Sequence, residues 1–184
     1  MAKRVLVPIA DGTEEIEAVC IIDTLRRAGA EVTVASVDKL QVTASRGVKL
    51  VADARIADCT NQTYDCIALP GGMPGAEHLR DCAPLIDLLQ KQKQAGRLYA
   101  AICASPAVVL QPRGLLDKVR ATCFPALQNK LDPAYVSRER VVVDGPCVTS
   151  QGPATAIEFA LKLVELLFGP AKAKEVGDAM LVTV

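Results

Sequence analysis

The chain has 184 residues, of which 51% are hydrophobic and 23% are charged, and its formal net charge at pH 7 is +0. This composition excludes an intrinsically disordered chain, and the balanced charge argues against nucleic acid or an acidic membrane surface as a primary partner. The length predicts a single domain, residues 1–184, which is large enough to bury a core without disulfides or a metal ion.

Seven cysteines are spread along the chain, and none forms a C-x-x-C pair with another. An odd number without paired spacing argues against a disulfide scaffold and against a zinc ribbon, so we expect free thiols in a reducing compartment. The apolar run at residues 5–7 is too short for a signal peptide, and no segment approaches the length of a membrane span. These features predict a cytoplasmic protein without a membrane partner.

A β-α-β unit is predicted at the start of the chain. Residues 4–9 and 31–37 have the apolar character of strands, and the helical pattern between them ends at Gly29. Such a unit implies a right-handed crossover and a parallel sheet. Asp11 or Thr13 can cap this helix.

Three glutamates lie near the beginning of the predicted helix. Glu14 and Glu15 are expected in a solvated first turn, where acidic side chains complement the helix dipole. Glu17 lies at the edge of the apolar arc, so its carboxylate can face the sheet. Helical phase does not separate Glu14 from Glu17, and pattern alone leaves the choice between them open.

A hairpin is predicted next, with strands over residues 40–44 and 48–51. Arg46 lies at its tip. An arginine in that position is usually solvated, and spacing alone assigns it nothing more.

Two adjacent glycines, Gly71 and Gly72, follow a buried strand predicted over residues 64–69. Adjacent glycines at the end of a strand let the backbone approach a ligand closely and present N–H groups, as an oxyanion hole requires. The alternative is a plain turn. The chain contains neither of the usual glycine-rich phosphate-binding motifs, so nucleotide binding loses its main support.

Cys103 stands where the pattern changes from a short buried strand, residues 98–102, to a helical segment. Ser105 is the expected cap of that segment, and Pro106 suits its first turn. A cysteine in a strand-to-helix turn receives the free N–H groups of the helix, which lower the thiol pKa and favour the thiolate. The alternative is a buried cysteine that acts as a small hydrophobic residue.

The remaining segments complete an α/β pattern. Helices are expected over residues 84–94, 153–169 and 171–178, and short strands over residues 115–122, 140–143 and 147–150. The whole pattern predicts an open, doubly wound, mostly parallel sheet with helices on both faces, in which ligands bind at the carboxyl ends of the strands.

Few residues can serve as a base for Cys103. The chain has one histidine, His78, and Ala104 rather than a histidine follows the cysteine. A carboxylate is therefore the best remaining proton acceptor, and Glu17 is the candidate. Burial and a nearby thiolate are expected to raise its pKa.

Four short motifs occur along the chain: residues 9–17 (IADGTEEIE), 69–72 (LPGG), 100–106 (AAICASP) and 149–153 (TSQGP). Together they resemble the ThiJ/PfpI superfamily and, within it, the parkinsonism-associated deglycase (DJ-one) branch. The resemblance extends from the first predicted strand to the last long helix. It implies a flavodoxin-like fold and a homodimer.

The resemblance assigns roles to residues that match the family motifs. Cys103 matches the reactive cysteine, and Glu17 matches the buried glutamate, which decides the choice that helical phase leaves open. The N–H groups of Gly72 and Ala104 match the oxyanion-binding pair, and Gly71 belongs to the same substrate-binding turn.

Two arginines also match the family, and some positions depart from it. Arg46 and Arg27 match arginines near the active site and the dimer interface. Phe124 stands where some members have a histidine beside the active site. Ala44 and Val51 stand where other members carry additional cysteines, so redox behaviour at those positions does not carry over.

The resemblance implies a cofactor-independent glyoxalase and deglycase that acts on methylglyoxal, glyoxal and their adducts with side chains. The alternative is a redox-sensing homodimeric chaperone in which Cys103 is oxidised to a sulfinate. A cysteine peptidase is a third interpretation, disfavoured because no histidine follows Cys103.

Overall fold

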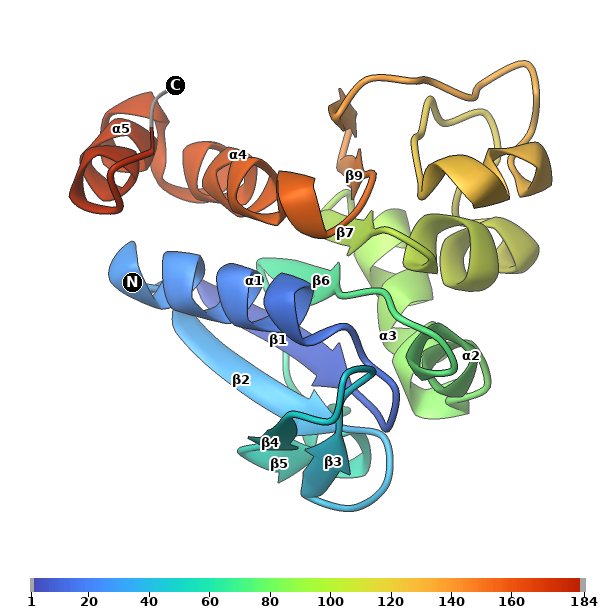
Figure 1. Ribbon diagram of the computed structural model, residues 1–184, viewed down its shortest axis with the longest axis horizontal. Helices are drawn as coiled ribbons and strands as arrows, with labels where there is room; N and C mark the ends of the chain where they lie inside the picture. The colour runs from blue at the N-terminus through green and yellow to red at the C-terminus, as the bar shows by residue number, and fades with distance from the viewer. Residues whose placement is uncertain (1, 183–184) are drawn as a thin grey trace.

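The computed structural model describes residues 2–182 and contains one large, mostly parallel sheet (Figure 1). The order of its strands is β5-β2-β1-β6-β7-β9-β8, and β8 is antiparallel to β9 while the other neighbours are parallel. The predicted doubly wound α/β class is therefore confirmed. The strands are β1 (Arg4–Ile9), β2 (Glu31–Ser36), β5 (Ala54–Arg55), β6 (Cys66–Leu69), β7 (Leu98–Ile102), β8 (Val141–Asp144) and β9 (Cys147–Ser150), with a separate hairpin of β3 (Gln41–Thr43) and β4 (Lys49–Val51).

Helices cover both faces of the sheet. The chain passes from β1 to β2 in one direction along the sheet and from β6 to β7 in the other, so right-handed crossovers place the intervening helices on opposite faces. Figure 1 shows the first and fourth helices side by side, and they pack against each other. No helix within residues 2–182 has the length and apolar character needed to cross a membrane. The α-helices are α1 (Glu15–Arg27), α2 (Gly75–Arg80), α3 (Ala83–Gln94), α4 (Ala156–Phe168) and α5 (Pro170–Ala179); shorter helical segments are η1 (Ile56–Cys59), η2 (Pro106–Leu110), η3 (Gln111–Arg113), η4 (Pro125–Lys130) and η5 (Pro153–Thr155).

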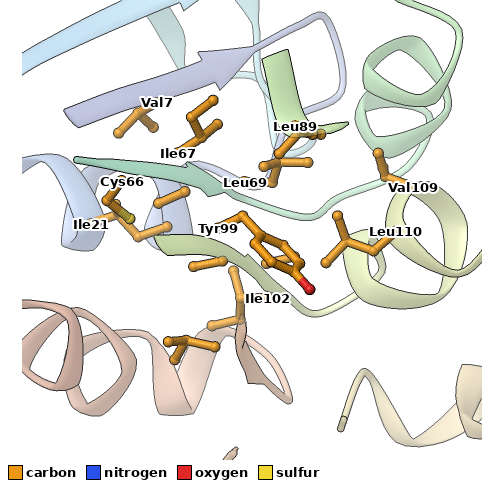
Figure 2. Packing of buried hydrophobic residues seen from close by; sticks show 14 of the residues in the cluster. Val7, Ile21, Cys66, Ile67, Leu69, Leu89, Tyr99, Ile102, Val109 and Leu110 are labelled. Atoms are coloured by element: carbon orange, nitrogen blue, oxygen red, sulfur yellow. The ribbon is translucent and has the colours of Figure 1, made fainter. Parts of the chain in front are cut away.

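The core surrounds the central strands. Every residue of β6 is buried, as are four of the five residues of β7, which is expected for parallel strands covered on both faces. Figure 2 shows Ile67 and Tyr99 of these strands among side chains that include Ile21 of α1 and Leu89 of α3. Each such side chain contributes roughly 1.5–3 kcal/mol when fully buried. Packing on both faces therefore holds β6 and β7 rigidly, including the carboxyl ends at which the following turns begin.

The prediction of a strand over residues 115–122 is wrong. Gly114 has a φ of 67° and Lys118 a φ of 58°, so the backbone turns twice in the left-handed region, which a strand does not allow. A single bridge between Ala121 and Val136 is the only pairing in this stretch of the described chain.

The cap of α1 also differs from the prediction. Glu14 occupies the N-cap position, and its side chain accepts a hydrogen bond from the Glu17 N–H at 2.8 Å. The two expected caps have other partners: Asp11 accepts from the amide of a β3 residue, and Thr13 accepts from the Ala10 N–H at 2.9 Å. The loop before α1 is thus fixed by its own side chains.

Candidate active site

Cys103 lies in a strained turn at the carboxyl end of β7. Its φ is 63°, a left-handed conformation that costs a non-glycine residue on the order of 1–3 kcal/mol. Neighbouring backbone holds this turn on both sides, because the Cys103 N–H donates to the Ser150 carbonyl at 3.0 Å and its carbonyl accepts from Phe124 N–H at 2.8 Å. The side chain of Cys103 is 9% exposed. The thiol is therefore held in one position with a narrow opening to solvent.

The segment after Cys103 is a π-helix, η2, and Ser105 does not cap it. Ser105 already has helical backbone angles, φ −64° and ψ −34°, whereas a capping residue is usually extended. Its hydroxyl donates instead to the carbonyl of Pro70 at 2.6 Å. The sequence-based role of Ser105 is corrected: it connects the turns that follow β6 and β7.

Glu17 reaches the same place from the first turn of α1. Its side chain is fully buried, and Oε2 accepts a hydrogen bond from the Gly71 N–H at 2.7 Å. Oε1 is buried without a hydrogen-bond partner of normal geometry in the described part of the chain. Burial is the main reason that the pKa of Glu17 rises to about 7, and hydrogen bonds from Gly71 and Cys103 only partly oppose it. The carboxyl group can therefore gain or lose a proton near neutral pH.

Gly71 lies between the thiol and the carboxyl group. A Cβ at this position would stand 2.7 Å from the Cβ of Cys103, 2.9 Å from Ala104 N and 2.9 Å from Glu17 Oε2. No side chain fits at such distances. The absence of a side chain at residue 71 is what allows the two groups to converge.

Opposing influences act on the Cys103 thiol. Burial and the Glu17 carboxylate raise the pKa of Cys103 to about 12, whereas hydrogen bonds from the N–H groups of Gly72 and Ala104 lower it. The expectation that the turn lowers the thiol pKa is therefore wrong, because burial and the Glu17 carboxylate outweigh the two N–H groups. A proton on Glu17 removes the repulsion and lets the carboxyl group donate to sulfur. When Glu17 is ionised and the thiol is protonated, the pair carries one negative charge, which a proton transfer can move to sulfur.

Glu15 is buried, contrary to the expectation that it faces water. It is 7% exposed, and its carboxylate accepts hydrogen bonds from Ser45 Oγ and from the Arg46 N–H, both at 2.8 Å. Burial opposes ionisation, but hydrogen bonds from its own N–H, Ser45 and Arg46 outweigh it and lower the pKa of Glu15. The β3–β4 hairpin covers this residue, and local sequence gives no sign of that contact.

The two predicted arginines lie at different distances from the Cys103–Glu17 pair. The Arg46 amide binds Glu15 beside the first turn of α1, and its side chain is exposed at the hairpin tip. Arg27 lies in the last turn of α1 and pairs with Asp23 at 2.7 Å. Ten residues separate it from Glu17, or about 15 Å along the helix axis. This chain alone does not bring Arg27 to the site.

His78 lies outside the pair. Its Nδ1 is 3.0 Å from the carbonyl oxygen of Asp11, and its ring lines a cavity of about 360 Å³ together with Lys39 and Asp81. Among residues 2–182, no cluster of three or more His, Cys, Asp or Glu side chains is arranged to hold a metal ion.

Comparison with known proteins identifies the family. The model of the DJ-1/PfpI family matches residues 3–166. The chain belongs to this family. The predicted ThiJ/PfpI membership and flavodoxin-like fold are thereby confirmed.

Individual DJ-1/PfpI relatives match nearly the whole chain. Protein DJ-1 homolog B of Arabidopsis thaliana is 49% identical over 180 residues, which are 97% of this chain but 41% of the plant protein, so the chain spans less than half of that relative. Glutathione-independent glyoxalase DJR-1.2 of Caenorhabditis elegans is 39% identical over 171 residues, 91% of this chain and 89% of the worm protein. The solved structure of oxidized Toxoplasma gondii DJ-1 is 53% identical and covers 100% of both chains with a TM-score of 0.98.

Proposed function

We propose that the protein is a glutathione-independent glyoxalase that converts methylglyoxal to lactate and glyoxal to glycolate, and that also acts on their early adducts. One observation carries the proposal: a thiol, a carboxyl group that titrates near neutral pH and two backbone N–H groups meet around Gly71. The activity in the name of the worm relative supports the same reaction class.

The first step joins sulfur to the aldehyde carbon. The Glu17 carboxylate accepts the thiol proton while Cys103 Sγ attacks, and then passes it to the former aldehyde oxygen. The product is a hemithioacetal, and Glu17 is again a carboxylate. The N–H groups of Gly72 and Ala104, which act on the thiol to lower its pKa, are suited to bind the aldehyde oxygen as it gains negative charge.

The second step moves hydrogen within the adduct. Glu17 removes the proton from the former aldehyde carbon and delivers it to the neighbouring carbon, which turns the hemithioacetal into a thioester without an external oxidant. Water then hydrolyses the thioester, releases lactate and restores the thiol. In an early adduct the former aldehyde carbon is bonded to the thiol or amine of a side chain. Cys103 Sγ displaces that side chain at the same carbon, the side chain leaves unmodified with the thiol proton, and the resulting hemithioacetal reacts as above.

The proposal is tested by measuring lactate formed from methylglyoxal without glutathione. The native chain should form lactate, and Cys103→Ser should reduce its rate to the level of the buffer. Cys20→Ser is a matched control, because Cys20 is a free, half-buried thiol on α1 and should tolerate the change. Absence of lactate from the native chain, or equal rates in native protein and Cys103→Ser, would refute the proposal.

A second candidate function is redox sensing, with the protein acting as a chaperone under oxidative stress. Two observations favour it: Glu17 in its protonated form can donate to an oxygen added to Cys103, and the solved Toxoplasma relative is an oxidized protein. Mild peroxide should then add two oxygens to Cys103 and to no other cysteine, as read by peptide mass spectrometry. Oxidation spread over several cysteines would count against this function.

We further propose that the protein is a homodimer that buries the outer face of α1 and the neighbouring hairpin. Ile16 and Val19 on α1 are 54% and 49% exposed, and Val51 on β4 is 69% exposed. Large apolar side chains grouped on a surface usually mark an interface. Arg46 of the hairpin lies beside the first turn of α1, and Arg27 lies in its last turn. In a dimer, Arg27 of one copy can approach the Cys103–Glu17 pair of the other.

A further inference from the structure

The β3–β4 hairpin is hydrogen-bonded to the loop that precedes α1 and not to the main sheet, on which its Val42 packs in a small apolar cluster with Ile9 and Val34. Within the described residues its strands pair only with each other. Two backbone hydrogen bonds of 2.8 Å fix it to the loop, one from Gly12 N–H to the Thr43 carbonyl and one from Ser45 N–H to the Thr13 carbonyl. The hairpin thus supports the loop from outside.

Glu15 completes this attachment from the first turn of α1. Its carboxylate accepts from Ser45 Oγ and from the amide of Arg46, and no cation pairs with it among the described residues. A buried carboxylate is tolerated only when hydrogen bonds replace water, and hydrogen bonds to an ionised acceptor are about twice as strong as neutral ones. Glu15 therefore adds two charge-assisted hydrogen bonds at the hairpin tip to the backbone bonds that hold the hairpin and to the bond between Asp11 and the Thr43 N–H.

The supported loop forms a wall of the Gly71–Gly72 turn. The Glu14 N–H donates to the Gly71 carbonyl at 2.9 Å. Gly72, with a φ of 91°, has no room for a Cβ because Glu14 N and Gly12 O lie against it. A displacement of the loop would therefore move the Gly72 N–H. It would also move Glu17, because the Glu17 N–H donates to the side chain of Glu14 in that loop.

We infer that Glu15 is a positioning residue: by fixing the hairpin to residues 11–14, it holds the Gly72 N–H and the Glu17 carboxyl group against Cys103. Glu15 itself does not touch the reacting atoms. The inference has two tests. The kinetic test rests on the proposed function, whereas the second test measures the reactivity of Cys103 and needs no turnover.

The kinetic test compares Glu15→Gln with changes at its hydrogen-bond donor. Glu15→Gln and Ser45→Ala should lower kcat for methylglyoxal by up to about 100-fold, the loss that a 1 Å displacement of a catalytic group can cause, and should leave KM nearly unchanged. Ser45→Thr keeps the hydroxyl and should retain kcat. Lys49→Ala is the control for the hairpin alone, because Lys49 binds Thr43 Oγ1 within the hairpin and does not touch Glu15.

The second test is the pH dependence of Cys103 alkylation by iodoacetamide, read by mass spectrometry on protein that circular dichroism shows to be folded. Cys103, Gly71 and Glu14 are the groups that influence Glu17, so displacement of the first turn changes the coupled titration. The midpoint should move in Glu15→Gln and Ser45→Ala and stay in place in Ser45→Thr and Lys49→Ala.

These outcomes separate the two proposals. If the native chain forms no lactate, the proposed function fails, and the alkylation profiles still decide the role of Glu15. If Glu15→Gln does not fold, the pair Ser45→Ala and Ser45→Thr decides it. Unchanged kcat and an unchanged alkylation midpoint in folded Ser45→Ala or Glu15→Gln would overturn the inference.

Discussion

The hydroxyl of Ser105 donates a hydrogen bond of 2.6 Å to the carbonyl oxygen of Pro70. Ser105 follows the strained turn of Cys103 by two residues, and Pro70 directly precedes Gly71. A single buried side chain therefore connects the backbone that carries the thiol with the backbone that binds the carboxyl group.

Ser105→Ala should weaken both stability and activity. The variant leaves the buried Pro70 carbonyl without its partner, which should lower the free energy of unfolding by about 1–3 kcal/mol. Loosening of the two turns should also lower kcat. Urea unfolding and lactate formation measure the two effects. Ser137→Ala, at a buried hydroxyl that accepts from the Glu139 N–H, is the control and should keep its activity. Full activity of Ser105→Ala would contradict this connection.

Gly71→Ala should abolish lactate formation. The new Cβ would clash with Cys103, Ala104 and Glu17 at 2.7–2.9 Å, so the thiol and the carboxyl group must move apart. The matched control is Gly96→Ala, where φ is 64° but nothing lies within 4 Å of the new Cβ. That control should lose only about 1 kcal/mol of stability and keep its activity. An active Gly71→Ala would show that the pair does not need this geometry.

Glu17 should make stability fall as the pH rises from about 5 to 8. Its folded-state pKa of about 7 lies above the ordinary value of 4.5, so the folded state binds the proton more tightly than the unfolded state does. The stabilisation is complete below pH 4.5 and is lost as the pH passes 7, which amounts to about 3 kcal/mol.

Glu17→Gln isolates this contribution. Urea unfolding of both proteins should show that the variant gains about 3 kcal/mol relative to the native chain between acidic and mildly alkaline pH. Titrating groups other than Cys103, whose pKa depends on Glu17, contribute equally to both proteins and cancel. A difference in stability that does not vary with pH would mean that Glu17 titrates normally.

Val51→Asp should convert the proposed dimer into monomers. A charge in the centre of an apolar interface has to be desolvated without a partner, and association should weaken strongly. Sedimentation velocity measures the change. Leu166→Asp is the control, because Leu166 is also exposed, 41%, but lies on α4, outside the hairpin and α1. Equal sedimentation of both variants and the native chain would place the interface elsewhere or exclude it.

Most of the fold follows from local sequence. The bounds of β1, β7 and β9 agree with the prediction, since each is a short apolar run limited by glycine, proline or polar residues. The hairpin was also predicted, and β3 and β4 pair as expected. The strand predicted over residues 115–122 does not form, because two residues with left-handed backbone angles, Gly114 and Lys118, reverse the chain at an apolar segment.

The site was less accessible to sequence reasoning, because long-range contacts build it. Periodicity placed Glu17 only at the edge of the buried face, and its bond to Gly71 spans 54 positions in the sequence. Glu15 looked solvated because its partners lie on a hairpin about thirty residues away. Ser105 resembled a cap, since no local feature reveals its bond to Pro70.

The crowding around Gly71 also limits how the sequence can change during evolution. Among chains that keep the Cys103 and Glu17 equivalents, residue 71 should always be glycine, because even a methyl group would separate the pair. At Gly29, Gly47 and Gly145 no atom lies within 4 Å of an added Cβ, so a substitution there meets no clash and costs only the strain of a positive φ, which asparagine and aspartate tolerate best. Gly71 should therefore be conserved together with Cys103 and Glu17 in related chains.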